Sequence, residues 1–301
     1  MSPGDLGQPS PSAPRFDTQP FEADGGFQPM GLIVAFVAAV VAGVAMGWLA
    51  SLISQWFYLI LIFPAVIGGA VGFAGALAVQ FGKVRNPWLA GLAGAVGGVT
   101  ATVAMHYFDY GKFVSILQEK EPAALRVWEQ SGRGFVDFVD LSATQGVQIG
   151  RAGRGGGKGL NLGYVGSYIY WGVELLIVAG IAFAIMIGAS REPYCTRCNT
   201  WKESRPLGRL AMPQADALAA FASGQLTQLA TQSFADPGGN LQVKVAVCPS
   251  CREASSVDVK LETITKDEKG NDKTSEVAHV TYPGHALQVL EALATPRPGP
   301  A

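Results

Sequence analysis

The cysteines of this chain fall into two pairs with the same spacing. Two lie in the stretch Tyr-Cys-Thr-Arg-Cys-Asn-Thr-Trp, and two, about fifty residues later, lie in Val-Cys-Pro-Ser-Cys-Arg. A Cys-x-x-Cys turn can present two thiolates to the same side of an ion, and four thiolates at about 2.3 Å complete a tetrahedral shell. The spacing therefore predicts one closed metal site whose ligands are Cys195, Cys198, Cys248 and Cys251.

This double pattern resembles the four-cysteine modules of the zinc-ribbon and zinc-knuckle class over about residues 194–282, and no family is recognised for the whole chain. The resemblance implies a structural Zn²⁺ ion. Asn199, directly after the first pair, suits the left-handed backbone conformation in which such a turn often ends. The interval between the pairs exceeds the usual spacing of roughly 15 to 20 residues. A helix predicted over Pro213–Ser233 accounts for the excess.

Strand signals surround the second cysteine pair. Apolar and polar residues alternate from Leu241 to Val247, and the segments Ser256–Lys266 and Lys273–Tyr282 flank a polar Asp-Glu-Lys-Gly-Asn-Asp turn. We expect a three-stranded antiparallel sheet. Because so small a sheet is marginal by itself, metal binding should be coupled to folding.

Thiol–disulfide chemistry is the rival interpretation of the cysteines, because a Cys-x-x-Cys at a helix start can have a depressed thiol pKa. A thioredoxin-like domain needs one such motif inside a βαβ unit, whereas this chain has two motifs and the first follows a long apolar run. A membrane thiol-disulfide oxidoreductase therefore stays open as an alternative. Four thiolates would already fill the site, so we expect His279 and His285 to be surface or packing residues.

Composition places the chain among membrane proteins. Its 301 residues are 49% hydrophobic and 15% charged, and its mean hydropathy of +0.25 is too high for an ordinary soluble domain. The predicted fold is an α-helical integral membrane bundle of four transmembrane helices, followed by a small α+β domain of the four-cysteine, zinc-ribbon-like kind. Four apolar runs are long enough to span about 30 Å of hydrocarbon: Met30–Ile53, Phe57–Phe81, Trp88–Tyr107 and Tyr168–Ala189.

The domain organisation follows from these segments. We expect a disordered Pro/Gly/Ser-rich tail over residues 1–29, the transmembrane region over 30–189 with a long loop at 108–166, the soluble domain over 190–294, and a second disordered tail over 295–301. Basic residues in the short second loop and after the fourth run place both termini in the cytoplasm, by the positive-inside rule. The chain is then a multi-pass protein of the cell's inner or plasma membrane.

Three of the apolar runs carry glycines four residues apart. In lipid, helices associate through close backbone approach rather than through a hydrophobic force, and glycines at this spacing provide a flat face for it. We expect these faces to serve helix packing, within the bundle or in self-association. The pairs are Gly43 with Gly47, Gly68 with Gly72, and Gly94 with Gly98.

Glu174 is an acidic residue about five residues inside the fourth apolar run. A carboxylate in hydrocarbon is costly, so such a residue faces the bundle, pairs with another group or stays protonated, unless it lies near enough to the interface to find water or headgroups. His106, at the same-side end of the third run, is the nearest candidate partner. A subunit of a transporter or channel with Glu174 as an intramembrane polar site is therefore a second alternative.

No nucleophile system or paired-carboxylate site is recognisable, so we expect no enzymatic activity. The stretch Gly150–Gly159 departs from the Walker phosphate-loop pattern at Ala152 and Gly159. A net charge of -1 gives no indication of nucleic-acid binding, and no small-molecule substrate is inferred. The leading hypothesis is a non-enzymatic integral membrane protein whose cytoplasmic structural-zinc domain binds another protein.

Overall fold

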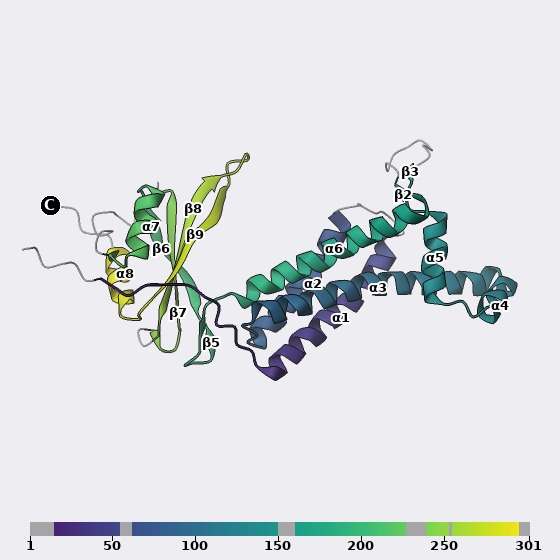
Figure 1. Cartoon of the computed structure of the whole chain (residues 1–301), viewed down its shortest axis with the longest axis horizontal. Helices are drawn as coiled ribbons and strands as arrows, with labels where there is room; N and C mark the ends of the chain where they lie inside the picture. Colours follow the sequence, from purple (N-terminus) through teal and green to yellow (C-terminus); the bar gives the residue numbers. More distant parts are fainter. Residues whose placement is uncertain (1–14, 55–61, 150–159, 227–238, 253–254, 295–301) are drawn as a thin grey trace, which may run out of the picture. The chain divides into compact units, whose positions relative to one another are not determined.

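The computed structural model describes residues 15–54, 62–149, 160–226, 239–252 and 255–294, and these form two compact units. The helical unit contains the described residues from Asp24 to Arg191. The sheet unit contains those up to Ala23 together with those from Glu192 onward. The chain therefore passes between the units twice, once before the first long helix and once after the last (Figure 1).

Four helices of the helical unit are long and apolar enough to cross a membrane, as the sequence predicts. α1 and α6 each pack against both α2 and α3, which makes a four-helix bundle. The predicted start of the second span at Phe57 lies outside the described residues. The helices are α1 (Pro29–Ile53), α2 (Ile62–Phe81), α3 (Pro87–Lys120) and α6 (Gly163–Ser190).

Helix α1 of the bundle buries small residues and exposes large ones. On α1 the large side chain of Val37 is 55% exposed, and that of Val41 is 62% exposed. A water-soluble bundle shows the reverse arrangement, whereas a membrane bundle packs through small residues and turns large apolar ones toward lipid. This pattern suggests a membrane protein. The small residues of α1 are buried at every fourth position, namely Gly31, Ala35, Ala39, Gly43 and Gly47.

The three glycine pairs lie at helix–helix contacts inside the bundle. A Cβ on Gly47 would lie 2.5 Å from the Ala101 carbonyl oxygen of α3, and a Cβ on Gly68 would lie 2.7 Å from that of Val178 on α6. Gly94 also faces α6. The expected packing role is confirmed, and helices of the same chain cover these glycine faces.

The connection over 108–166 is largely helical where it is described. α3 continues to Lys120 instead of ending at Tyr107, and it stops because Pro122 disfavours a helical backbone at the preceding residue. The glycine-rich stretch 150–159 lies outside the described residues. The elements that follow α3 are α4 (Pro122–Gln130), α5 (Phe135–Gln145), β2 (Gln148–Ile149) and β3 (Leu160–Asn161).

Aromatic contacts hold α4 and α5 to the extension of α3. The ring of Phe113 lies 5.3 Å from that of Trp128 on α4 and 5.2 Å from that of Phe138 on α5, measured between centroids. At about 1.5 Å per residue α3 is roughly 50 Å long, which exceeds a hydrocarbon core of about 30 Å. A membrane-crossing α3 therefore carries α4 and α5 outside the hydrocarbon.

The sheet unit is built on a five-stranded antiparallel sheet in the order β1-β9-β8-β7-β6. The three predicted strands correspond to β7, β8 and β9, which pair in sequence order. β6 was not predicted because Pro206 and Gly208 interrupt its pattern, and the register shifts between them, as an edge strand tolerates. The strands are β1 (Gln19–Pro20), β6 (Glu203–Leu210), β7 (Leu241–Val247), β8 (Val257–Lys266) and β9 (Asp272–Tyr282).

One face of this sheet carries the hydrophobic core, and two helices, α7 (Gln214–Ala222) and α8 (Ala286–Ala294), pack into it. The predicted alternation in β7 is confirmed, because Leu241, Val243 and Val245 are fully buried. The helix predicted over 213–233 ends early, at Ala222, since Gly224 adopts a φ of +70°, a conformation that terminates helices. Residues 227–238 lie outside the described part of the chain.

Residues 15–28 have defined partners, although the sequence placed them in a disordered tail. In the sheet unit, β1 pairs with β9 and Phe16 is 8% exposed within the core. In the helical unit, Asp24 forms an ion pair with Arg85, and Asn86 Nδ2 donates a hydrogen bond of 3.1 Å to the carbonyl oxygen of Gly25. Composition was misleading here because a few well-placed side chains, not a hydrophobic period, anchor the segment.

Replacing Gly94 and Gly98 together with leucine should destabilise the helical unit by roughly 2–5 kcal/mol. A Cβ on Gly98 would lie 2.5 Å from the Ala179 Cα, so the new side chains must push α3 away from α6. Thermal unfolding of the purified chain in detergent measures the loss. The control is Gly180→Leu on α6, where a Cβ meets nothing within 4 Å. Equal melting of the two variants would contradict the packing role.

Candidate metal centre

The first cysteine pair lies in a short hairpin formed by β4 (Tyr194–Cys195) and β5 (Thr200–Trp201). The two strands pair antiparallel, with Cys195 opposite Thr200. Asn199 adopts a φ of 53°, as its position after the pair predicted, and its Oδ1 accepts a hydrogen bond from the Tyr194 hydroxyl. The hairpin therefore fixes where Cys195 and Cys198 point.

The second pair lies in the turn that begins where β7 ends. The backbone N–H of Arg252 donates a hydrogen bond of 3.0 Å to the carbonyl oxygen of Cys248. Arg252 has a φ of 31°, so it too lies in the left-handed region. Both turns thus end in the same way, on a left-handed residue directly after their second cysteine, Cys198 or Cys251.

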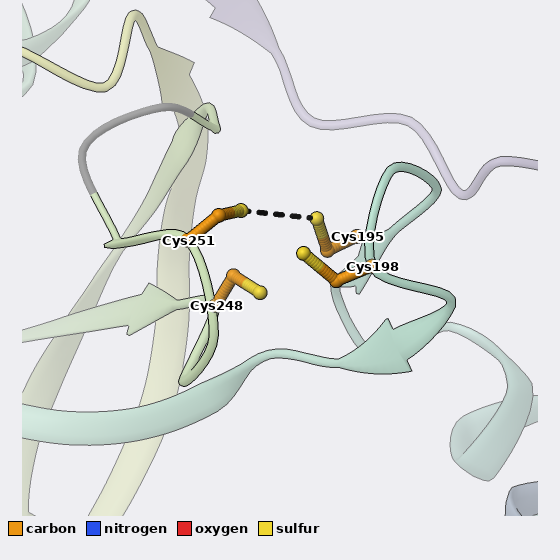
Figure 2. A group of neighbouring side chains, drawn as sticks. All are labelled: Cys195, Cys198, Cys248 and Cys251. Carbon is orange, nitrogen blue, oxygen red and sulfur yellow. Dashed lines mark hydrogen bonds between the residues drawn. The ribbon is translucent and has the colours of Figure 1, made fainter.

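The four cysteine side chains converge on one point, two from each turn (Figure 2). All four Sγ atoms lie within 4.8 Å of one another, and those of Cys195 and Cys251 are 3.7 Å apart. Four sulfurs at about 2.3 Å from a tetrahedral ion lie about 3.8 Å from each other. A disulfide would instead need about 2.05 Å. The spacing therefore fits a metal ion, and all four thiols are free.

Hydrogen bonds inside the cluster separate the thiol pKa values. Burial opposes ionisation of Cys248, but the backbone N–H groups of Cys251 and Ser250 donate to its sulfur, and together these effects lower the pKa of Cys248 to about 7. The hydrogen bond with Cys251, together with burial, raises the pKa of Cys198 to about 12. Burial is also the main reason that the pKa of Cys195 is raised. Full ionisation of the cluster therefore requires a cation to compensate the charge.

A buried ion pair anchors the first turn to the sheet. Lys202 Nζ lies 2.7 Å from Asp258 Oδ2 and donates two further hydrogen bonds to Ser256, to its carbonyl oxygen and to its Oγ. Asp258 Oδ1 accepts from Thr281 Oγ1 over 2.6 Å. Two charges can be buried because each has hydrogen-bond partners. Lys202 follows the first turn and Asp258 follows the second, so the pair links the segments that carry the cysteines.

Sequence reasoning did not find this ion pair. In the sequence, Lys202 is one of several charged residues after the fourth apolar run, and Asp258 falls in the segment Ser256–Lys266 that is predicted as a strand. The sequence carried only a weak sign that Asp258 is buried. Val257 and Val259 flank it, and its strand follows a cysteine turn. Pairing across the sheet, which sequence spacing does not reveal, brings the two charges together.

The two histidines of the sheet unit pack against aromatic side chains. The ring of His279 is stacked on that of Phe21, with centroids 3.9 Å apart and planes at 14°. The ring of His285 lies 5.4 Å from that of Phe16. Among the described residues, the group with metal-ligand geometry contains only the four cysteines.

Glu174 lies inside the helical unit with 4% of its surface exposed. It lines a small pocket with residues of α2 and α3, including Pro64 and Thr102. The space open to the centre of a water molecule is about 10 Å³, which is about enough for one water. The ring of His106 meets that of Trp171, one turn before Glu174, edge-on at 5.1 Å. The pairing of Glu174 with His106 stays a prediction.

No family model, curated protein or solved structure matches this chain. The four apolar helices and the cysteine cluster therefore stand on their own residues and geometry. They indicate a membrane protein with a site that can hold a metal ion.

Removing one partner of the buried ion pair should destabilise the sheet unit strongly. Lys202→Met would leave the Asp258 carboxylate buried without its charge partner, at a cost of about 3–5 kcal/mol. Lys260→Met is the matched control, since the Lys260 ammonium pairs with Glu276 at the surface and such pairs contribute about 0–1 kcal/mol. Unfolding of the two variants, followed by circular dichroism of the full chain in detergent, compares them. Similar losses would mean that the buried pair does not anchor the cysteine turns.

Proposed function

We propose that this chain is a non-enzymatic integral membrane protein that presents a structural-zinc domain on the cytoplasmic side for binding another protein. The observation that carries the proposal is the closed set of four thiols, with Sγ atoms within 4.8 Å of one another. Four protein ligands complete a tetrahedral shell and leave no open position for water or substrate, which is the mark of structural rather than catalytic zinc.

The ligand set favours zinc over other metals. Thiolates select soft or borderline ions, and a tetrahedral site of four sulfurs is typical of zinc or of iron–sulfur chemistry. The left-handed residues Asn199 and Arg252 give both turns the compact form that presents two sulfurs to one ion. Zn²⁺ has no redox chemistry, so its role here is to hold the two turns together.

The division of the chain into two units supports the proposal that the segments before and after the four long helices lie on the same side of the membrane. The sheet unit includes β1, which precedes the first long helix, and all described strands that follow the fourth. Four membrane crossings return the chain to the side from which it started. Free thiolates persist in a reducing compartment, so that side is the cytoplasm in this proposal.

A protein-binding role is the function that such a domain supports best. A structural ion, a buried ion pair and a five-stranded sheet make a rigid scaffold, and the chain joins this scaffold to the helical unit at both of its boundaries. A membrane-anchored scaffold can hold a partner at the bilayer without any reaction. This step draws on the kind of domain, not on a likeness to a named protein.

Metal content and redox behaviour of the full chain in detergent test this proposal. We expect about one zinc per chain under reducing conditions, with affinity that falls as the pH drops, because protons compete with zinc for the thiolates. Cys248→Ser should lose the metal and lower the melting temperature of the sheet unit by roughly 10 °C or more. Ser250→Ala, in the same turn, keeps all four ligands and should behave as the wild type.

The redox alternative makes the opposite forecast. A thiol-disulfide oxidoreductase would contain little metal and would form a reversible disulfide within Cys195/Cys198 or Cys248/Cys251 at physiological potentials. Such a disulfide, detected by mass spectrometry in a metal-free and fully folded chain, would replace the structural-zinc proposal.

A transporter or channel subunit is a second candidate, favoured by the burial of Glu174 beside a pocket of the helical unit. A buried carboxyl at membrane depth is a natural ion or proton site. Proton flux into vesicles that contain the chain, followed with a pH-sensitive dye, should then drop at least about tenfold in Glu174→Gln. Thr102→Val, in the same pocket, is the control for altered packing. Equal flux in all variants and in empty vesicles would exclude this candidate.

A further inference from the structure

The segment from Arg15 to Phe21 lies in the sheet unit as an extended peptide. Its backbone adds to the edge of the sheet: Gln19 pairs with Thr281 and Pro20 with Val280 of β9. The N–H of Phe21 then donates a hydrogen bond of 3.0 Å to the carbonyl oxygen of His279. This is the arrangement by which many domains bind a peptide as an additional strand.

The end of α7 forms the other wall of this site. The backbone N–H of Phe16 donates to the carbonyl oxygen of Gly224 over 3.1 Å, and the Thr18 hydroxyl donates to that of Ala222 over 2.8 Å. A helix end leaves carbonyl groups without partners inside the helix, and this segment supplies donors for two groups there. A Cβ on Gly224 would collide with the Phe16 carbonyl oxygen, so the glycine leaves room for the segment.

Two aromatic side chains anchor the segment, five residues apart. Phe16 is buried in the hydrophobic core and lies against His285, and Phe21 is stacked on His279 at 3.9 Å. Asp17 and Gln19 between them are exposed. A buried anchor and a half-buried anchor with exposed positions between them, on a backbone that pairs with a strand edge, are the features of a bound ligand peptide.

We propose that the sheet unit contains a peptide-binding groove between the end of α7 and the edge of β9, which takes an extended segment of the pattern Phe-x-Thr-x-x-Phe. Residues 15–21 are its occupant in cis, and a partner protein with this pattern takes their place. This inference deepens the proposed function, on which it rests, by naming the chemistry of the partner. It does not require the metal itself to contact the partner.

The attachments of the segment allow such an exchange. β1 pairs through two residues only, and the following residues, Asp24 to Gly26, are held separately by Arg85 and Asn86 of the helical unit. The segment can therefore leave the groove while the bundle stays folded. A tethered segment has an effective concentration in the millimolar range, so the cis occupant excludes weak competitors until it is released.

The test uses the full chain in detergent with a protease site inserted between Ala23 and Asp24. Before cleavage, a fluorescent peptide of residues 10–24 should bind poorly, because it competes with a tethered copy. After cleavage, it should exchange with the N-terminal fragment, and its apparent affinity should rise at least about tenfold. Cleavage leaves the fragment seated until the peptide replaces it, so the fold of the sheet unit is preserved throughout.

Peptide variants separate groove binding from general adhesion. A Phe16→Ala peptide should bind about ten- to a hundredfold more weakly, since a buried phenylalanine side chain is lost. An Asp17→Ala peptide, altered at an exposed position, should bind within about threefold of the parent. Equal binding of the two variants, or a cleaved fragment that excess peptide never displaces, overturns the inference.

Zinc content is measured in the same samples, so the two proposals can fail separately. Peptide exchange in a chain without zinc would refute the metal role and leave the groove standing. A chain that contains zinc but shows no exchange would refute the groove and leave the metal role standing.

Discussion

The structure of the sheet unit depends on one constraint: four thiol groups, carried by two turns about fifty residues apart, must lie close enough together to bind one ion. The first turn leads through β5 into β6, and the second begins where β7 ends. Because β6 and β7 pair with Glu203 opposite Val247, both turns are brought to the same end of the sheet. The Lys202–Asp258 pair then joins the residues that follow each turn. Strand pairing, buried charge and sulfur spacing therefore converge on one site, which an ion would lock.

The packing of the helical unit differs from that of the sheet unit, which suggests different surroundings. In the sheet unit, large apolar residues such as Leu241 and Tyr282 are buried, and the buried charges of Lys202 and Asp258 are paired. On α1 of the bundle, Ala39 and Gly43 are buried while Val37 and Val41 are exposed, an arrangement that allows close backbone approach and suits a lipid environment. The chain passes between the two units twice, after Ala23 and after Arg191. Residues 15–23 therefore belong to the sheet unit although they precede the first long helix.

Features with a strong local signal could be predicted from the sequence. The four long helices follow from uninterrupted apolar runs, β7 follows from strict alternation, and the cysteine cluster follows from two identical spacings. Features that depend on a distant partner could not. β1 and β6 are strands because β9 and β7 pair with them, and neither has an alternating pattern of its own.

The extent of α3 and the burial of Lys202 were missed for related reasons. Hydropathy marks where a helix leaves hydrocarbon, not where it ends. The continuation of α3 to Lys120 mixes charged residues with apolar ones such as Phe113, so the apolar run ended before the helix did. A lysine after a membrane span reads as a solvated charge until the sheet brings a carboxylate to 2.7 Å from it. The cysteine site could be predicted without knowledge of the fold, because two Cys-x-x-Cys pairs are by themselves typical of a metal site.

X-ray absorption at the zinc edge of the purified full chain tests the central claim most directly. The account predicts a first shell of four sulfur atoms at about 2.3 Å with no nitrogen or oxygen ligand. A shell with mixed nitrogen or oxygen ligands, or the absence of zinc from a folded and reduced chain, would contradict it.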